Sequence, residues 1–107
     1  MTINERGEIF MPFESILNQP GKAANQPESV FTFLDAQLRV GHTVNLDFQN
    51  TNVMSPSFAY IAFGKLYDKY GESVLELIKI SNDKMNLKER IQQALNRRAE
   101  VLKYERA

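Results

Sequence analysis

The sequence predicts an α/β domain: a small mixed β-sheet with helices packed on it and a long helix toward the C-terminal end. Segments with the two-residue apolar period of a strand alternate with segments that have the 3.6-residue period of a helix. This alternation is typical of parallel strands joined by helical crossovers. The chain has 107 residues, of which 43% are hydrophobic, so we expect residues 1–107 to form a single domain around one core.

Three strands are expected, at residues 7–13, 43–48 and 74–80. Residues 43–48 (TVNLDF) alternate apolar and polar side chains, as a strand with one buried face does. Residues 74–80 (VLELIKI) carry apolar side chains on both faces and suit a strand that is covered on both sides. Pro12 interrupts the first strand, which indicates an edge position or a strand end, since proline gives no amide hydrogen to a sheet.

Three helices are expected, at residues 27–40, 56–70 and 84–104, and residues 14–27 are expected to form a long loop. The first two helices begin at a proline and are followed by a glycine. Proline suits the first helical position, and glycine suits the position after the last turn. Gly64 falls inside the second helix, where we expect it to allow a close contact with the sheet.

The last helix has an apolar stripe that begins at Leu87 and is interrupted by Arg98. Because a charged residue in the stripe cannot face the core cheaply, we expect the end of this helix to project beyond it. Val101, Leu102 and Tyr104 are then free to contact a partner or a second copy of the chain.

The composition argues against several classes of protein. Lysine and arginine together number 13, as do aspartate and glutamate, so net charge gives no attraction to nucleic acid or to an anionic membrane. No stretch has the ~20 apolar residues of a membrane span, and the N-terminus lacks the apolar core of a signal peptide. Cysteine is absent, which excludes thiol chemistry and thiolate metal sites. We expect a soluble, cytoplasmic protein.

No set of catalytic residues stands out, so we expect neither an enzyme nor a cofactor. His42 is the sole histidine and lies in a turn, so it has no second histidine for a metal pair. No carboxylate pair has a spacing that singles it out for acid–base chemistry, and no glycine-rich phosphate loop is present. Asp47 lies in the C-terminal part of the strand expected at residues 43–48, where ligand sites of α/β proteins gather, although it also suits a turn-holding role.

Two serines flank the proline at the start of the second helix. Ser55 precedes Pro56 and suits the N-cap position, where its side chain accepts a hydrogen bond from a backbone amide one turn on. Ser57 then lies in the first turn, at the positive end of the helix dipole. A phosphate on Ser57 would be well placed for the free amides there. Ser57 is therefore either a phosphate acceptor or an ordinary small polar residue of a first turn.

The stretch LDFQNTNVM followed by SPSFAYIAFGKLYDKYG resembles the STAS-like family of small bacterial domains of unknown function, which are related to the STAS domains of anti-sigma factor antagonists. The resemblance is best over residues 43–95 and implies a STAS-like fold. In the antagonists, a partner kinase phosphorylates a hydroxyl in the same strand-to-helix segment, and that hydroxyl falls on Ser57. The aspartate and the glycine of the antagonists are replaced here by Ser55 and Phe58. Tyr60 follows where many relatives carry acidic residues.

The resemblance implies a non-enzymatic regulatory module that docks on a signalling protein through the helix start. Its partner would be a histidine-kinase-like ATPase or a similar protein, and a homodimer is a further candidate assembly. The alternative is a sensor of a small ligand or nucleotide that uses the same helix N-terminus as an anion site. The candidate contact residues, which include the candidate phosphate acceptor, are Ser55, Ser57, Phe58, Tyr60 and Asp47.

Overall fold

The computed structural model describes residues 2–17 and 27–106 of the chain, which form a four-stranded sheet in the order β1-β2-β3-β4. Strand β1 (Thr2–Ile3) pairs antiparallel with β2 (Glu8–Pro12). Strands β2, β3 (Thr43–Asp47) and β4 (Ile78–Ser81) are parallel. The sheet is therefore mixed, as the sequence predicts.

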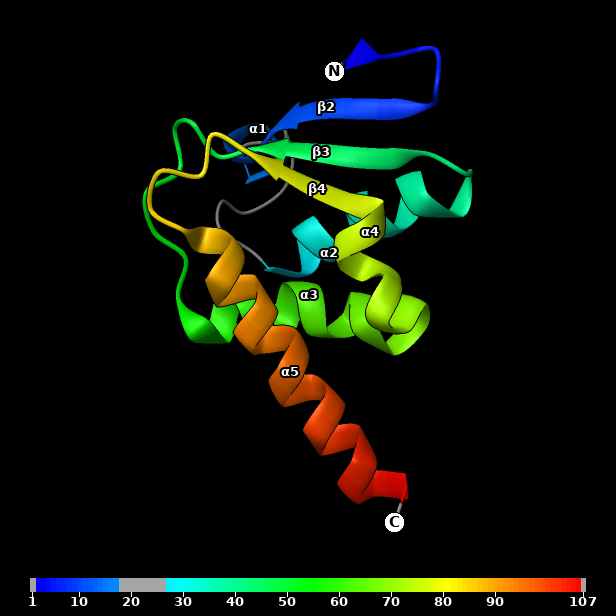
Figure 1. Cartoon of the computed structure of the whole chain (residues 1–107), viewed down its shortest axis with the longest axis vertical. Helices are drawn as coiled ribbons and strands as arrows, with labels where there is room; N and C mark the ends of the chain where they lie inside the picture. Colours follow the sequence, from blue (N-terminus) through cyan, green and yellow to red (C-terminus); the bar gives the residue numbers. More distant parts are fainter. Residues whose placement is uncertain (1, 18–26, 107) are drawn as a thin grey trace.

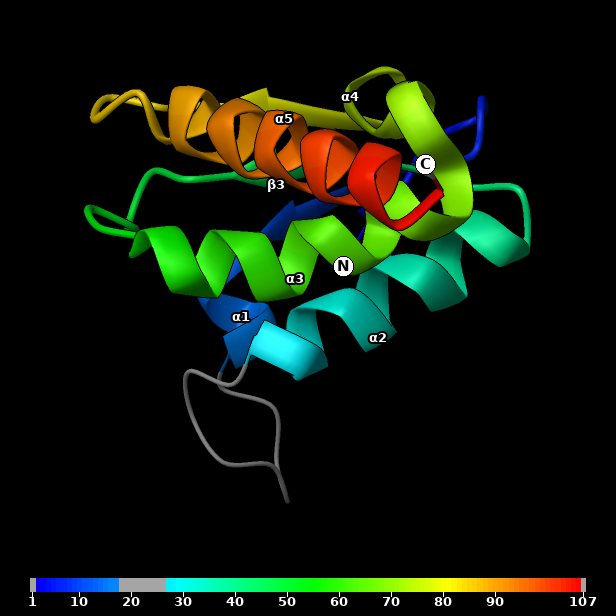
Figure 2. The same ribbon diagram turned by 90° about the horizontal axis from the view of Figure 1, so that it is seen from below.

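Helices connect the parallel strands and gather on one face of the sheet (Figures 1 and 2). The long helices are α2 (Pro27–Arg39), α3 (Pro56–Tyr70) and α5 (Leu87–Arg106). Because the strands follow one another in sequence order, right-handed crossovers place α2 and α3 on the same side. Among the described residues, no helix has both the length and the apolar content that crossing a membrane requires.

The core lies between this face of the sheet and the helices. The strand residues that point into it are fully or nearly fully buried: Ile9, Met11, Val44, Leu46 and Ile78. Alternate residues point to the other face, where Phe10 is 44% exposed and Lys79 is exposed. The period-two pattern of residues 43–48 thus predicted the buried face of β3 correctly.

The N-terminal region differs from the prediction at residues 13–17. The expected loop at residues 14–27 begins with a helix, α1 (Phe13–Leu17), because Phe13 and Ile16 are both buried and one helical turn brings them to the same side. Residues 18–26 of that expected loop lie outside the described residues. Pro12 is the last residue of β2, so it marks a strand end.

The prediction of a strand at residues 74–80 is wrong for the first half of that segment. Gly71–Ser73 form a short 3₁₀ turn (η1), Val74–Leu77 form one helical turn (α4), and β4 begins only at Ile78. In an extended strand, Glu76 would share the core face of Val74 and Ile78, and a carboxylate there is costly. The helical turn buries Val74 and leaves Glu76 exposed.

Helix α5 begins at Leu87, three residues later than expected. Asp83 caps it, since its carboxylate accepts hydrogen bonds from the amides of Leu87 at 2.6 Å and Lys88 at 2.8 Å. Asn86 has a positive φ of 54° and cannot continue a helix backward toward residue 84. The cap therefore fixes where α5 starts.

The contact at Gly64 is with α5 and not, as expected, with the sheet. A β-carbon built at Gly64 would lie 3.7 Å from the Cγ and Cδ atoms of Arg98. The Arg98 side chain thus lies across α3, although the sequence suggested only a break in the stripe. Beyond it the end of α5 projects from the rest of the molecule (Figure 1), and Tyr104 is 83% exposed.

Candidate functional site

The start of α3 is fixed by Ser55, which acts as the N-cap that the sequence predicts. Its backbone is extended (φ −69°, ψ 155°), and its Oγ accepts a hydrogen bond from the amide of Phe58 at 3.1 Å. The carbonyl of Ser55 accepts the first helical bond, from the amide of Ala59 at 3.0 Å. Pro56 follows as the first helical residue, where its missing amide hydrogen costs nothing.

Ser57 lies in the first turn of α3 and is exposed. Its Oγ is 3.4 Å from the Oγ of Ser55, which is already engaged by the Phe58 amide. The first turn of α3 contains no acidic residue, so the positive end of the helix dipole is not offset within the helix. The Ser57 hydroxyl therefore faces solvent at a position that favours negative charge.

Phe58 anchors the helix start to the core. It is half-buried, and its ring centroid lies 6.3 Å from that of Phe13 in an edge-on arrangement. Phe13 itself packs edge-on against Phe48 at 5.0 Å. Such aromatic contacts add about 0.5–1.5 kcal/mol beyond burial. The site residue Phe58 thus holds the exposed serines in place more than it offers a surface of its own.

Tyr60 points toward α5 and joins a polar contact between the two helices. Its hydroxyl accepts a hydrogen bond from Arg98 Nη1 at 3.3 Å. Arg98 also makes a bidentate pair with Asp68, with Nε–Oδ1 at 2.7 Å and Nη2–Oδ2 at 2.9 Å. The hydrogen bond to Asp68 is the main reason that the pKa of Arg98 is raised above its usual range. The Tyr60 ring centroid also lies 6.0 Å from the guanidinium carbon of Arg97.

A groove of about 410 Å³ runs between the start of α3 and the middle of α5. We call it the α3–α5 groove, and its lining residues are Pro56, Tyr60, Arg90, Gln93, Ala94, Asn96, Arg97 and Glu100. Sequence reasoning included Tyr60 but missed the α5 side. The signal was present, because Arg90, Gln93 and Arg97 are spaced three and four residues apart and share one helix face.

Asp47 ends β3 and holds the turn after it. Its Oδ1 accepts hydrogen bonds from the amide of Gln49 and from Asn82 Nδ2, both at 2.9 Å. It lines a separate depression of about 510 Å³ beside Phe10 on the face of the sheet that the helices leave open. The C-terminal end of β3 lies on the same side of the molecule as the start of α3 (Figure 1), but the hydrogen bonds of Asp47 tie the ends of β3 and β4 together.

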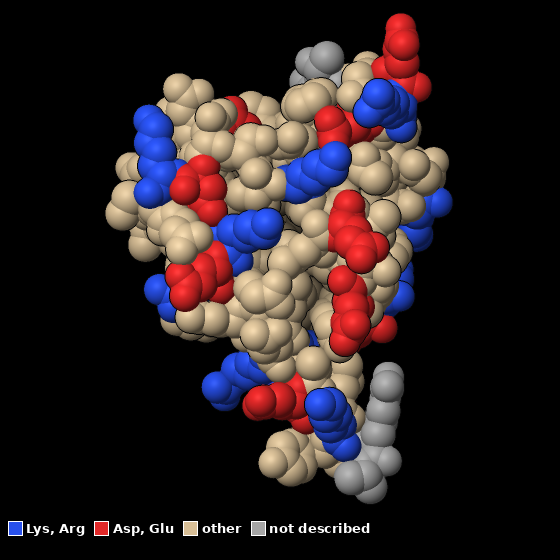
Figure 3. Space-filling model, viewed as in Figure 1, with Lys and Arg blue, Asp and Glu red and all other residues tan. Residues whose placement is uncertain are grey.

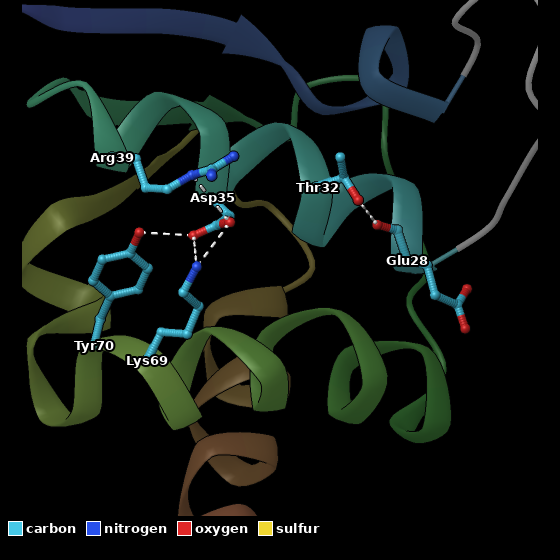
Figure 4. A network of polar contacts seen from close by, with 6 residues as sticks. All are labelled: Glu28, Thr32, Asp35, Arg39, Lys69 and Tyr70. Carbon is cyan, nitrogen blue, oxygen red and sulfur yellow. Dashed lines mark hydrogen bonds and ion pairs between the residues drawn. The ribbon is translucent and has the colours of Figure 1, made fainter.

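A second polar cluster, which sequence reasoning missed, joins the other end of α3 to α2 (Figure 4). Asp35 is only 6% exposed, and its carboxylate accepts hydrogen bonds from Lys69 Nζ at 2.9 and 3.0 Å and from the Tyr70 hydroxyl at 2.8 Å. Arg39 approaches the same carboxylate at 3.4 Å. The bond from Lys69 is the chief reason that the pKa of Asp35 lies below its ordinary value, whereas burial is the chief reason that the pKa of Tyr70 is raised.

The remaining candidate groups do not form a site. His42 Nδ1 lies 3.2 Å from the side-chain oxygen of Gln37, a local contact in the turn before β3. Within residues 2–17 and 27–106, no three histidine, cysteine, aspartate or glutamate side chains gather as a metal site would require. Positive and negative side chains alternate over the face shown in Figure 3. The distinctive features are therefore the start of α3 and the groove beside it.

A protein-family model described as a STAS-like domain of unknown function (DUF4325) matches residues 28–88. The match covers more than half of the chain and runs from α2 through β4 to the first residues of α5. It begins earlier than the segment 43–95 on which the sequence resemblance rests. No curated protein and no solved structure is significantly similar to the chain. The matched segment and the parallel α/β architecture together show that the chain belongs to the family of STAS-like domains of unknown function.

Proposed function

We propose that the chain is a non-enzymatic regulatory module that docks on a signalling protein through the start of α3, residues Ser55–Tyr60. The observation that carries this proposal is the exposed pair of serines at the positive end of a helix whose underside Phe58 ties to the core. A surface held rigidly from below loses little conformational entropy when a partner covers it. We place this activity in the cytoplasm, in keeping with a chain that has no cysteine.

Ser57 is the candidate switch within this surface. Its hydroxyl does not cap the helix, because the Phe58 amide is bound by Ser55. A histidine-kinase-like ATPase, the partner class that the resemblance suggests, would transfer the γ-phosphoryl group of ATP to Ser57 Oγ. ADP would leave, and the hydroxyl proton would pass to solvent. The phosphate would lie at the positive end of the α3 dipole and place negative charge on the docking surface.

The test is capture of a protein partner from the native host, followed by binding isotherms. We expect Ser57→Glu to weaken the captured complex by about tenfold, or about 1.4 kcal/mol, through desolvation and repulsion. Ser57→Ala should bind nearly as well as the unmodified chain, since it adds no charge. Ser73→Glu is the matched control, because it places the same charge on an exposed serine beyond the other end of α3. Equal affinities for Ser57→Ala and Ser57→Glu contradict the switch.

The second candidate function is a sensor of an anionic small ligand or nucleotide at the same helix start. It is favoured by the absence of an acidic residue from the first turn of α3. A nucleotide that binds there should raise the melting temperature of the chain by mass action. Ser57→Glu should abolish that rise and Ser73→Glu should not. A melting temperature that nucleotides leave unchanged removes this candidate and leaves protein docking.

A further inference from the structure

The α3–α5 groove carries two arginines, Arg90 and Arg97, that pair with no carboxylate of the described residues. Both arginines are exposed. The neighbouring Arg98 differs, because Asp68 and Tyr60 engage it. Exposed arginines are common, but these two share one wall of a groove.

Arg97 is also partly ordered before any partner arrives. Its guanidinium carbon lies 6.0 Å from the centroid of the Tyr60 ring, a cation–π distance. The Tyr60 ring is in turn fixed by the hydrogen bond from Arg98 to its hydroxyl. A guanidinium that is already positioned loses less entropy when it forms a bidentate pair with a carboxylate.

The charge of the groove is positive on balance. Arg90 and Arg97 line it, and Glu100 is the one acidic residue among its lining side chains. Pro56 on the opposite wall is the first residue of α3, so the positive end of that helix adds to the same potential. The chain as a whole has equal numbers of acidic and basic residues, so this attraction is local to the groove.

We propose that the α3–α5 groove docks an acidic segment of the protein partner, whose carboxylates pair with Arg90 and Arg97 and whose apolar side chains contact Tyr60 and Pro56. This inference rests on the proposed function and adds the chemistry of the partner to it. The two arginines are seven positions apart, a rise of about 10 Å along α5. The segment should therefore present carboxylates about that far apart, as a helix does with two acidic residues seven positions apart.

The probes are three amphipathic peptides that differ only at the two positions seven residues apart, which carry Glu, Gln or Lys. Each is titrated into isotopically labelled protein, and the amide shifts are followed by NMR. We expect the Glu peptide to shift the amides of Tyr60, Arg90 and Arg97 and to bind about tenfold more tightly than the Gln peptide. The Lys peptide should not bind, and added salt should weaken the binding of the Glu peptide.

The protein variants separate the groove from net charge. The double variant Arg90→Glu/Arg97→Glu should lose about tenfold in affinity for the Glu peptide. The control Lys84→Glu/Lys103→Glu makes the same change in charge at exposed positions of the chain outside the groove lining. Equal binding of the Glu and Gln peptides overturns the proposal, as do equal losses in the two double variants.

The captured partner then tells the two proposals apart. A complex that depends on Ser57 but tolerates Arg90→Glu/Arg97→Glu overturns the acidic-segment proposal and leaves docking through the start of α3 intact. A different outcome is also informative. If the Glu peptide binds in the groove and the affinity of the captured complex is unchanged by Ser57→Glu, the acidic-segment proposal is supported and docking at the serines is overturned.

Discussion

The two ends of α3 use their polar side chains in opposite ways. At the C-terminal end, Lys69 and Tyr70 both donate hydrogen bonds to the buried carboxylate of Asp35 on α2. At the N-terminal end, Ser55 caps the helix and Ser57 is exposed. Lys69 and Tyr70 are therefore already hydrogen-bonded within the fold. At the other end, the Ser57 hydroxyl and the positive end of the helix dipole remain available to a partner.

This difference separates a structural polar cluster from a candidate recognition surface. A buried carboxylate must be paired, because an unpaired one is costly, and so the Asp35 cluster holds α2 against α3. The start of α3 has no buried charge that must be paired. Substitutions at the C-terminal end should therefore change stability, and substitutions at Ser57 should change binding more than stability.

The largest expected effect is at the C-terminal end, where Lys69→Met should lower the free energy of unfolding by roughly 1–3 kcal/mol. The variant keeps the aliphatic length of the side chain but removes the strongest partner of Asp35. Denaturant unfolding measures the change. Lys88→Met is the control, because Lys88 is exposed on α5 and its loss should fall within about 0.5 kcal/mol. Equal midpoints for the two variants would mean that the Asp35 cluster adds nothing to stability.

Acid should affect the same cluster. Lys69 is the main cause of the lowered pKa of Asp35. The stability from this pair is therefore fully present above the ordinary aspartate pKa of about 3.9 and is lost as the pH falls through the lower folded value. We expect Lys69→Met to lose less stability on acidification than the unmodified chain does. Unfolding curves in steps from about pH 7 downward measure this, and parallel losses would refute the assignment.

At the other end, Ser55→Ala should cost about 1 kcal/mol, because the Phe58 amide loses its acceptor. Ser55→Asp should be tolerated, since aspartate also caps and its charge favours the helix start. The comparison of the two denaturation midpoints isolates the cap from the loss of a hydroxyl. If Ser55→Ala unfolds at the same denaturation midpoint as the unmodified chain, the cap does not contribute to stability.

The smallest expected effect has the opposite sign. Ser57→Glu should stabilise the chain by roughly 0.3–1 kcal/mol at low salt, because it places negative charge at the positive end of α3. Salt should reduce this gain, because it screens the introduced charge from the helix dipole. Melting curves at two salt concentrations test the point. A destabilised Ser57→Glu would show that the serine side chain is needed for packing, and the contrast between the two ends of α3 would disappear.

The elements that the sequence predicted well are those with long periodic patterns. Helix α3 has the predicted bounds, and α2 ends one residue before its predicted end. The short elements were missed for physical reasons. Strand β1 has two residues and α4 has four, so neither is long enough to display a period, and their form depends on which side chains the finished core buries.

The candidate site was predictable only where its chemistry is local. Ser55 could be identified as a cap because the proline and the amide that it serves are within three residues. The pair between Arg98 and Asp68 joins residues thirty positions apart, and Arg98 looked like an interruption of an apolar stripe. Asp35 was likewise hidden, because its burial and its partner Lys69 follow from the packing of α2 on α3. Contacts between helices of this kind have no signature in either helix alone.

The projecting end of α5 implies that this helix does not open as one unit. Its first turns bury Leu87 and Ile91 and are capped by Asp83, so their amides should exchange with deuterium only when the whole domain unfolds. Beyond Arg98 the helix loses most of its tertiary contacts, and Tyr104 is largely exposed. Amides there should exchange through local fraying, many times faster, with the Arg98 contact as the boundary between the two regimes.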